Sequence, residues 1–549
     1  MGFTFHKRKL KKFLKNELQL VFFSLLTGVF SGVTVTVYNV LMHYGEVYSV
    51  AWYEALLANP ALIPLLFVAL ALGAIVIGTV LKFVPLARGS GVPQAEGAIR
   101  GCIVITKWFR MLTTSFALSL ATAFLGMTSG GEGPSMLIGG MSGEGVASMT
   151  KRNKRFARYL VTGGASSGLA VAANAPLMGF LFAFEEAHKK FTPEIFLTAF
   201  FSVVSGVFTR SGLHLLFGLI DPSITISPTL HNFDLTTVTN FTDLGGMIGV
   251  VIISAIVVGL LGVGFYYAVV ALRPLFAKMT FFKGTGKFLI PFLLAGAFGL
   301  ISVYEMGNGH SIIESLGTNG GVNAFSLSLN FASPLIVSLV VVLVMKFIAS
   351  VLNMGAGVPC GVFIPMLSVG ACAGGLISYV ASTCGMNPAY SDIIVMICMA
   401  TFFATIVKAP LTSIVMVFEL TGSYNFTLLL PVMLGVAIGY FIGRLCSTHA
   451  IYDVILEGFI ESDGVAKKGI KERFVMTVES ASPADDSEVH DLLLPWATAI
   501  IAIKRDGRDN ISPSAETILN VGDELTIEAE TDDREATEKE LLAVTSGEE

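Results

Sequence analysis

One acid stands out as a candidate for ion or proton chemistry. Glu132 lies in the segment 128–134, Thr-Ser-Gly-Gly-Glu-Gly-Pro, within a long apolar tract that carries almost no other charge. A carboxylate at bilayer depth costs roughly 3 kcal/mol, so such a residue usually marks a route for ions or protons. The flanking glycines let backbone N–H groups converge on an anion and also interrupt a helix. An acid among anion-binding amides predicts a gate.

The composition of the chain predicts the elements that position this acid. Of the 549 residues, 53% are hydrophobic and 14% are charged, and the mean hydropathy is +0.74. Several apolar runs approach or exceed the roughly 20 residues of a membrane-spanning helix; they cover residues 18–41, 61–81, 244–272, 288–303 and 334–351. Other apolar stretches, such as 136–140 and 362–376, are broken by Gly or Pro, which membranes tolerate where the backbone is buried in protein. We expect an all-α polytopic membrane protein with tilted, broken helices.

The distribution of charge divides the chain into a membrane body and a tail. From Glu461 onward there are 9 basic and 22 acidic residues, whereas 26 basic and 18 acidic residues precede Glu461. We therefore expect a basic N-terminus over 1–19, a membrane domain over 20–460 and an acidic soluble domain over 461–549. The six cysteines show no metal-ligand spacing and are interpreted as buried small hydrophobes.

Basic clusters predict the orientation of the body. Residues 6–12, His-Lys-Arg-Lys-Leu-Lys-Lys, precede the first apolar run, and Lys and Arg also dominate residues 151–155. The positive-inside rule places both clusters, and hence both termini, in the cytoplasm of a bacterial-type inner membrane. A signal peptide is the alternative for the N-terminus, but the apolar run is long and no clear cleavage site follows it.

The two halves of the body repeat each other. Residues 174–185 and 408–419 share Ala-Pro-Leu and Phe-Glu at equal spacing, 234 positions apart, which pairs Glu185 with Glu419 as structural residues. Pro134 and Pro365 also correspond. Two similar halves with broken segments at matching places indicate a transporter with its site at the repeat interface. We expect halves over about 20–230 and 240–460.

Three of the broken segments carry a family resemblance. Gly-Ser-Gly-Val-Pro at 89–93, Gly-Gly-Glu-Gly-Pro at 130–134 and Gly-Val-Phe-Ile-Pro at 361–365 resemble the signature segments of the CLC chloride channels and transporters. Tyr452, in Ile-Tyr-Asp-Val-Ile-Leu, resembles the anion-binding tyrosine of the family's last membrane helix. The resemblance spans about residues 20–460. It implies two inverted repeats and a homodimer.

The resemblance implies a set of chloride ligands. Ser90 and Tyr452 would donate hydroxyl hydrogen bonds to a central chloride, and the amides of Val362 and Phe363 would donate from the far side. Helix N-termini suit a halide because they offer partial positive charge and free N–H groups without a full cation. Further implied residues frame an outer site that the Glu132 carboxylate can itself occupy: Gly130, Gly131 and Gly133. The alternatives are a helix N-cap for Ser90, an interfacial anchor for Tyr452 and core packing for Phe363.

Glu186 bears on whether transport is passive or coupled. In the family, an acid at the matching position is typical of proton-coupled exchangers, and a second carboxylate away from the anion path would relay protons to Glu132. The alternative is a solvated helix end beside Lys189 and Lys190. One departure from the family pattern matters here: Gly131 replaces the basic residue that is usual before the gating acid. Ser90, by contrast, is the residue typical of chloride-preferring members. We expect chloride/proton exchange, with a passive chloride channel as the alternative.

The tail suggests a regulatory domain. An apolar strand over 499–507, a turn and a second strand over 521–527 resemble the TrkA-C (RCK-C) domain over about 470–532. Such a domain binds a small ligand that the sequence does not identify, or serves in assembly.

A potassium-transport component is a remote alternative, but the body lacks a Thr-Val-Gly-Tyr-Gly filter. Another alternative is a membrane enzyme that uses Glu132 and Glu186 as an acid/base pair, but the sequence shows no nucleophile or metal cluster for it. Membrane lipid, chloride and protons are the expected partners, with no nucleic acid and no cofactor.

Overall fold

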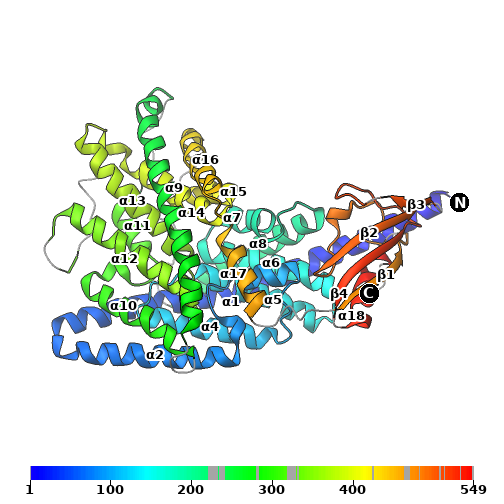
Figure 1. The fold of residues 1–549 in the computed structure, drawn as a ribbon, viewed down its shortest axis with the longest axis horizontal. Helices are drawn as coiled ribbons and strands as arrows, with labels where there is room; N and C mark the ends of the chain where they lie inside the picture. The colour runs from blue at the N-terminus through cyan, green and yellow to red at the C-terminus, as the bar shows by residue number, and fades with distance from the viewer. Residues whose placement is uncertain are drawn as a thin grey trace.

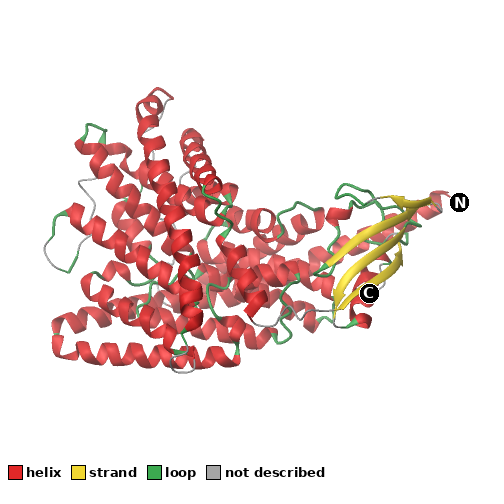
Figure 2. Cartoon of the chain, in the orientation of Figure 1, coloured by secondary structure: helices red, strands yellow, loops and turns green. Residues whose placement is uncertain are grey.

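The chain folds into a large helical body and a small α+β tail (Figures 1 and 2). The computed structural model describes residues 2–220, 233, 241–279, 284–317, 329–330, 333–422, 426–462, 470–480, 482–505, 508–511, 513–531 and 533–546. The first residues of α1 and the C-terminal sheet lie at the same end of the molecule. The expected boundary between the halves, residues 230–240, lies outside the described residues except for residue 233.

Among the described residues, eight α-helices precede residue 221, and ten more follow the expected boundary between the halves. The first group is α1 (Gly2–Ala58), α2 (Ile63–Phe83), α3 (Val92–Arg100), α4 (Trp108–Phe124), α5 (Glu132–Met149), α6 (Lys154–Ala173), α7 (Pro176–Phe182) and α8 (Pro193–Ile220). The second group is α9 (Phe241–Lys278), α10 (Leu289–Ile301), α11 (His310–Leu316), α12 (Leu335–Ala356), α13 (Phe363–Thr383), α14 (Ser391–Val407), α15 (Pro410–Thr421), α16 (Leu429–Leu445), α17 (Ile451–Ser462) and α18 (Arg534–Thr545). All but α18 belong to the body.

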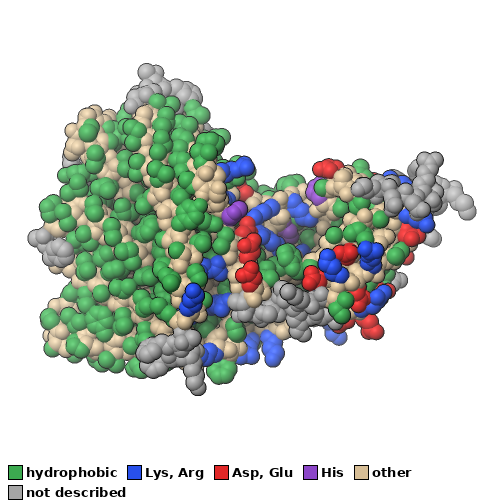
Figure 3. Space-filling view, viewed as in Figure 1, with side chains coloured by type: hydrophobic (Ala, Val, Ile, Leu, Met, Phe, Trp, Pro, Cys, Tyr) green, Lys and Arg blue, Asp and Glu red, His purple; other side chains and the backbone are tan. Residues whose placement is uncertain are grey.

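The body has the character of a multi-pass membrane protein, as predicted. Within the described residues, seven helices are long and apolar enough to cross a membrane: Glu17–Ala58, Pro60–Phe83, Pro193–Gly218, Met247–Lys278, Leu335–Ala356, Phe363–Thr383 and Pro388–Val407. Every residue of α14 is buried, so this helix forms the centre of the second half. Apolar side chains cover most of the visible face of the body, whereas charged side chains gather on the tail and in the recess beside it (Figure 3).

The two halves are tied together by exchanged carboxylates. Glu419, at the end of α15, accepts hydrogen bonds of 2.8 Å from the N–H groups of Leu177 and Met178 at the start of α7. Glu185, just after α7, accepts bonds of 2.8 and 2.6 Å from the N–H groups of Leu411 and Thr412 at the start of α15. Each repeat therefore supplies the N-terminal cap for the matching helix of the other repeat.

Replacing Glu419 with Gln should lower the free energy of unfolding by about 1–3 kcal/mol, because two N–H donors lose a charged acceptor. Thermal unfolding of the purified protein in detergent measures the change. Glu54→Gln on the exposed side of α1 is the control and should leave the midpoint unchanged. Equal midpoints for Glu419→Gln and Glu54→Gln would show that the exchanged caps do not stabilise the body.

The tail is a four-stranded antiparallel sheet covered by α18. The strands are β1 (Ile470–Thr477), β2 (Thr498–Arg505), β3 (Arg508–Ile511) and β4 (Glu524–Thr531), in the spatial order β1-β4-β2-β3. Alternate residues of β1, β2 and β4 face a core that includes Leu541 of α18. An α+β domain is thus confirmed.

The tail differs from the sequence-based expectation in three details. The second predicted strand begins at Glu524 rather than at 521, because Gly522 has a φ of +90° and the Asp523 carboxylate accepts the Asn520 N–H, which together form a turn. Strand β1 and helix α18 were not predicted. The charged residues Lys471, Glu472 and Arg473 conceal the inward positions of β1. The expected polar turn at 506–507 lies outside the described residues.

The turn before β4 contains a buried ion pair. Asp523 is 1% exposed, and its two carboxylate oxygens accept bonds of 2.7 Å from Nε and Nη2 of Arg505. Burial opposes ionisation, but the Arg505 guanidinium and the Asn520 N–H outweigh it and hold the pKa of Asp523 below its usual value. A carboxyl with a lowered folded-state pKa stabilises the fold above its unfolded-state pKa and loses that effect as the pH falls.

Asp523→Asn should destabilise the tail at neutral pH by about 1–3 kcal/mol, because the charge-assisted bonds to Arg505 are weakened. The wild-type advantage should shrink as the pH falls below about 4, the ordinary carboxyl pKa. Hydrogen exchange of tail peptides in the full chain, followed between pH 7 and pH 3, measures both effects. Glu516→Gln, at an exposed position, is the control. A pH-independent difference between wild type and Asp523→Asn would contradict this assignment.

Candidate functional site

Two of the signature segments are joined by direct backbone hydrogen bonds. Gly130 donates to the Gly361 carbonyl at 2.7 Å, and Gly361 donates back to the Gly130 carbonyl at 3.0 Å. The residues that follow, Gly131 and Val362, are the N-caps of helices α5 and α13. The starts of two broken helices, one from each half, therefore lie side by side.

The third signature segment packs against the same point. Gly91, the N-cap of α3, has a φ of +89°, and a Cβ built there would lie 2.7 Å from the Gly133 carbonyl oxygen. A Cβ on Gly133 would in turn overlap the Ser90 carbonyl oxygen. Only glycine allows this approach without strain. The N-termini of α3, α5 and α13 thus converge around Gly133 and Pro134.

The predicted hydroxyl ligands are buried beside these N-termini without partners. Ser90 is 7% exposed and Tyr452, in the first turn of α17, is 1% exposed. Neither hydroxyl oxygen has a hydrogen-bond partner among the described residues. Helix α17 packs against α3, the helix that Ser90 precedes. A buried unpartnered hydroxyl costs free energy unless another ligand satisfies it, so both hydroxyls are suited to an anion.

A cavity of about 470 Å³ leads to this region. Ser90, Cys360 and Val362 line it, together with part of α17. Its charged lining residues are three basic and two acidic ones: Arg88, Arg273, Lys287, Glu457 and Glu461. Arg273 donates to the carbonyls of Val454 and Ile455, and the Arg88 guanidinium lies 4.6 Å from the centre of the Phe459 ring. An anion reaching the cavity meets a mildly positive wall.

Glu132 lies at the first position of α5, between the glycines. Its side chain is 4% exposed, and its Oε2 atom has no hydrogen-bond partner among the described residues. The carboxylate is near the N–H groups of Gly131 and of Glu132 itself. Glu132 is thus a buried acid at a helix N-terminus that forms no ion pair among the described residues, and its role as a gate stays a prediction. Gly131 leaves room nearby, because a Cβ there would lie 3.7 Å from its nearest neighbours.

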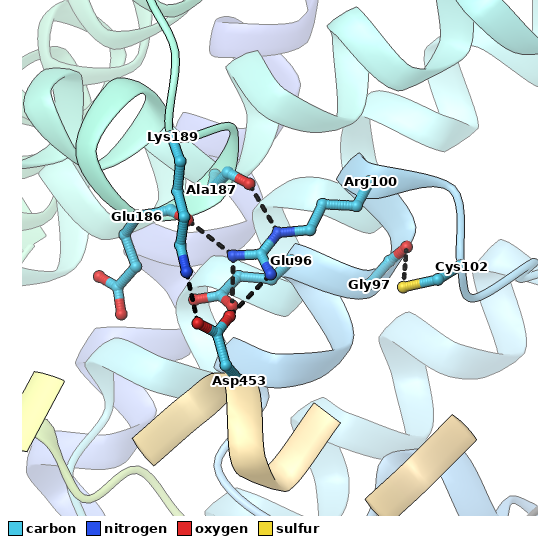
Figure 4. Close-up of polar contacts among 8 residues, drawn as sticks. All are labelled: Glu96, Gly97, Arg100, Cys102, Glu186, Ala187, Lys189 and Asp453. Carbon is cyan, nitrogen blue, oxygen red and sulfur yellow. Dashed lines mark hydrogen bonds and ion pairs between the residues drawn. The ribbon is translucent and has the colours of Figure 1, made fainter. Parts of the chain in front are cut away.

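Glu186 is buried, which contradicts the alternative of a solvated helix end. It is 5% exposed and lies in a π-helical turn, Ala183–Ala187, that continues α7. Lys189 pairs with Asp453 rather than with Glu186, and Lys190 donates to the His490 carbonyl in the tail. In Figure 4 no contact joins the Glu186 carboxylate to Lys189, whose ammonium group is directed to Asp453 instead.

Arg100 organises the surroundings of Glu186. At the end of α3, it donates to the backbone carbonyls of Glu186 and Ala187 at 2.8 and 2.9 Å. It also pairs with Glu96 at 3.2 Å and with Asp453, the residue after Tyr452, at 2.7 Å (Figure 4). Arg100 thus joins the turn that carries Glu186 to α3, the helix that Ser90 precedes, and to α17, the helix that carries Tyr452. The Glu186 carboxylate stays outside the ion pairs among the described residues.

The chain matches the family model described as "Voltage gated chloride channel" over residues 72–444, which is more than half of its length. It belongs to this family, commonly called CLC. A second match, to the TrkA-C domain, covers residues 474–542 and confirms the resemblance of the tail. This match ends within α18 and extends ten residues beyond the predicted limit of 532.

Curated relatives and solved structures agree with the CLC assignment. The H(+)/Cl(-) exchange transporter ClcA of Vibrio cholerae is 27% identical over 470 residues, which cover 83% of this chain and 93% of the relative. ClcA of Citrobacter koseri is 30% identical over 72% of this chain and 78% of the relative. A slow cyanobacterial Cl-/H+ antiporter superposes with a TM-score of 0.69, at 20% identity, over 81% of this chain and 99% of that structure. The predicted CLC-like fold is confirmed.

Three residues of the CLC body that surround Glu186 were not predicted from the sequence: Glu96, Arg100 and Asp453. Each is a charged residue in or beside a signature segment, and Glu96 and Arg100 are four positions apart on one helix. Glu96, which is fully inaccessible, pairs with Arg100 on the same helix. Their spacing was therefore a signal in the sequence, but Asp453, the other partner of Arg100, lies more than 350 positions away along the chain.

Gly133→Ala should abolish or strongly weaken chloride binding, because the new Cβ displaces the Ser90 carbonyl and with it the start of α3. Gly131→Ala is the matched control, since its Cβ makes only ordinary contacts and its amide is retained. Calorimetric titration of the purified proteins with chloride compares the two. Wild-type affinity in Gly133→Ala would show that the close approach of the two segments is not required for the site.

Proposed function

We propose that this CLC protein exchanges chloride for protons, with Glu132 as the gate and Glu186 as the internal proton relay. The observation that carries the proposal is the presence of two buried carboxylates, neither in an ion pair among the described residues, near buried hydroxyls that lack partners. The names of the curated relatives, H(+)/Cl(-) exchange transporters, support the same activity.

Chloride binds where the helix N-termini of the two halves meet. The Ser90 and Tyr452 hydroxyl groups donate hydrogen bonds to the chloride, and the backbone amides of Val362 and Phe363 donate hydrogen bonds from the start of α13. These groups supply partial charges rather than a full cation, so the anion is stripped of water without being trapped. The glycines Gly130, Gly131 and Gly133 leave the amides around Glu132 open to an anion at the outer site.

Glu132 alternates between two states that exclude each other. When it is ionised, its carboxylate accepts hydrogen bonds from the amides at the start of α5 and competes with chloride for these donors. Protonated, it loses its charge, leaves the amides and admits chloride. Because the same amides serve the carboxylate and the anion, each turnover requires a proton to be taken up and released.

Glu186 provides the inner end of the proton route. Arg100 fixes the backbone of its turn through two carbonyls and forms ion pairs with Glu96 and Asp453, which keeps the cation engaged elsewhere. The Glu186 carboxylate is left to gain and lose a proton. Neither Glu132 nor Glu186 lines the cavity that leads to Ser90, which keeps the proton route distinct from that cavity.

The proposal includes an orientation and an assembly. Leu20 near the start of the first span, Tyr159 of α6 and Leu493 of the tail share one apolar cluster, so the N-terminal region, the 151–155 loop and the tail lie on one side. The basic clusters make this side cytoplasmic, in a bacterial-type inner membrane. A homodimer with one pathway per subunit follows from the family resemblance. The potassium-transport alternative is not retained, because the body matches the chloride family.

Glu132→Gln and Glu186→Ala should each abolish proton movement coupled to chloride, while chloride flux persists and chloride still binds to Glu186→Ala. Neither variant can carry a proton at the substituted position, although the chloride ligands remain. A proton electrode and a chloride electrode, read together during chloride efflux from liposomes, give both fluxes. Glu54→Gln, at an exposed position, should retain the wild-type ratio.

Three results would decide against parts of the proposal. Wild-type protein that moves chloride without protons would be a passive channel. Proton movement driven against its own gradient by chloride in Glu186→Ala would remove the relay role. Full coupling in Glu132→Gln would remove the gate.

A further inference from the structure

A second cavity, of about 570 Å³, lies between the membrane body and the tail. One wall is the loop before α6 together with the first turns of that helix. The other wall is formed by Leu493 and Pro495, which precede β2, and by one side of α18. This cavity is separate from the one that leads to Ser90, because no described residue lines both.

The lining of the cavity is strongly positive. Half of its twelve lining residues are basic, and Glu540 is the one acid among them. The basic residues are Lys151, Arg152, Lys154, Arg155, Arg158 and Lys539. Glu540 is paired with Lys154, so it offsets only one of these charges. Like charges held together repel one another unless an anion lies among them.

Two arginines of this wall, Arg155 and Arg158, are held in place by uncharged groups. Arg158 donates to the backbone carbonyls of Ile99, Arg100 and Leu494 at 2.8–2.9 Å. The Arg155 guanidinium lies 5.7 Å from the centre of the Tyr159 ring, and its buried Nε has no hydrogen-bond partner among the described residues. Neither arginine has a carboxylate partner in the part of the chain that the structure describes. Their positions are fixed while their charges remain available.

The start of α6 adds to the positive potential. Asn153 is its N-cap, with its side chain accepting the Phe156 N–H, and the helix runs for 20 residues. The helix dipole places about half a positive charge at this end. Asn153 itself lines the cavity, so the helix N-terminus and the basic side chains act on the same space.

We propose that this cavity is a binding site for a phosphate-bearing anion. Phosphate groups match both the fork of donors on an arginine and the N–H groups of a helix start. The volume exceeds that of a single small ion and suits an organic phosphate or a phospholipid headgroup. Since Arg158 also binds the last carbonyls of α3, an anion here acts beside the helix that carries Arg100 and follows Ser90.

Full-length protein in a detergent without phosphate groups, titrated calorimetrically with inorganic pyrophosphate, tests the site. Lys539→Glu and Lys151→Glu, at exposed positions, should each weaken binding about tenfold or more, because each removes one favourable charge and adds a repulsive one. Lys107→Glu is the matched control: it changes the net charge equally at an exposed position outside the cavity and should bind as wild type does.

The outcome does not depend on transport. Absence of pyrophosphate binding to the wild type, or equal weakening by Lys107→Glu, overturns the proposal. Chloride flux should be the same for Lys539→Glu and wild type in liposomes whose lipids and buffer carry no phosphate groups. Equal flux confirms that the variant is folded. Failure of proton coupling would leave this binding result intact, so the two proposals fail separately.

The source of the phosphate can be resolved with the same variants. Native mass spectrometry after addition of phosphatidylglycerol shows whether lipid is retained by wild type and lost from Lys539→Glu, as a headgroup site requires. If both proteins retain the same lipid while pyrophosphate still distinguishes them, the ligand is a soluble phosphate compound. Each of these results supports the site and identifies its source.

Discussion

Helix N-termini buried in an apolar body must be met by negative charge, and this constraint governs the membrane part of the chain. At α7 and α15 the protein meets it permanently, with Glu419 and Glu185 held at 2.6–2.8 Å from the free N–H groups. At α3, α5 and α13 the nearby side chains are a serine hydroxyl, a tyrosine hydroxyl and one carboxylate at the very start of a helix. The N-termini of α7 and α15 are thus permanently capped and structural. The N-termini of α3, α5 and α13 need an anion from elsewhere, as the proposed transport pathway requires.

Much of this arrangement could be predicted from local sequence. The glycines within segments 89–91 and 130–133, together with Gly361, identify the broken helices because no other residue permits so close an approach of backbones. The Ala-Pro-Leu and Phe-Glu repeat identified Glu185 and Glu419 as a pair. Arg100 and Asp453 escaped because their interaction joins distant parts of the chain, and a single sequence gives no measure of such proximity. Strand β1 escaped for a different reason, since its three consecutive charges hide an inward pattern that only Phe474 and Met476 reveal.

The tail is attached to the body by more than its connecting segment. Leu493 enters an apolar cluster with residues of α1, α6 and α8, and Arg158 joins the carbonyl of Leu494 to those at the end of α3. The sequence predicts a separate acidic domain, and the structure adds one ion pair between that domain and the basic loop of the body, Glu540 with Lys154. The other basic side chains of the cavity between body and tail are not matched by further acids in its lining.

The exchange of caps between the halves also constrains how the protein can be made. Helix α7 is synthesised more than 230 residues before Glu419, the carboxylate that satisfies its first N–H groups. Throughout that interval the growing chain holds an uncapped helix end, and α15 finds its partner Glu185 already inserted. The first half therefore cannot reach its final packing before α15 has been synthesised, so completion of the native contacts of α7 must wait for the second half.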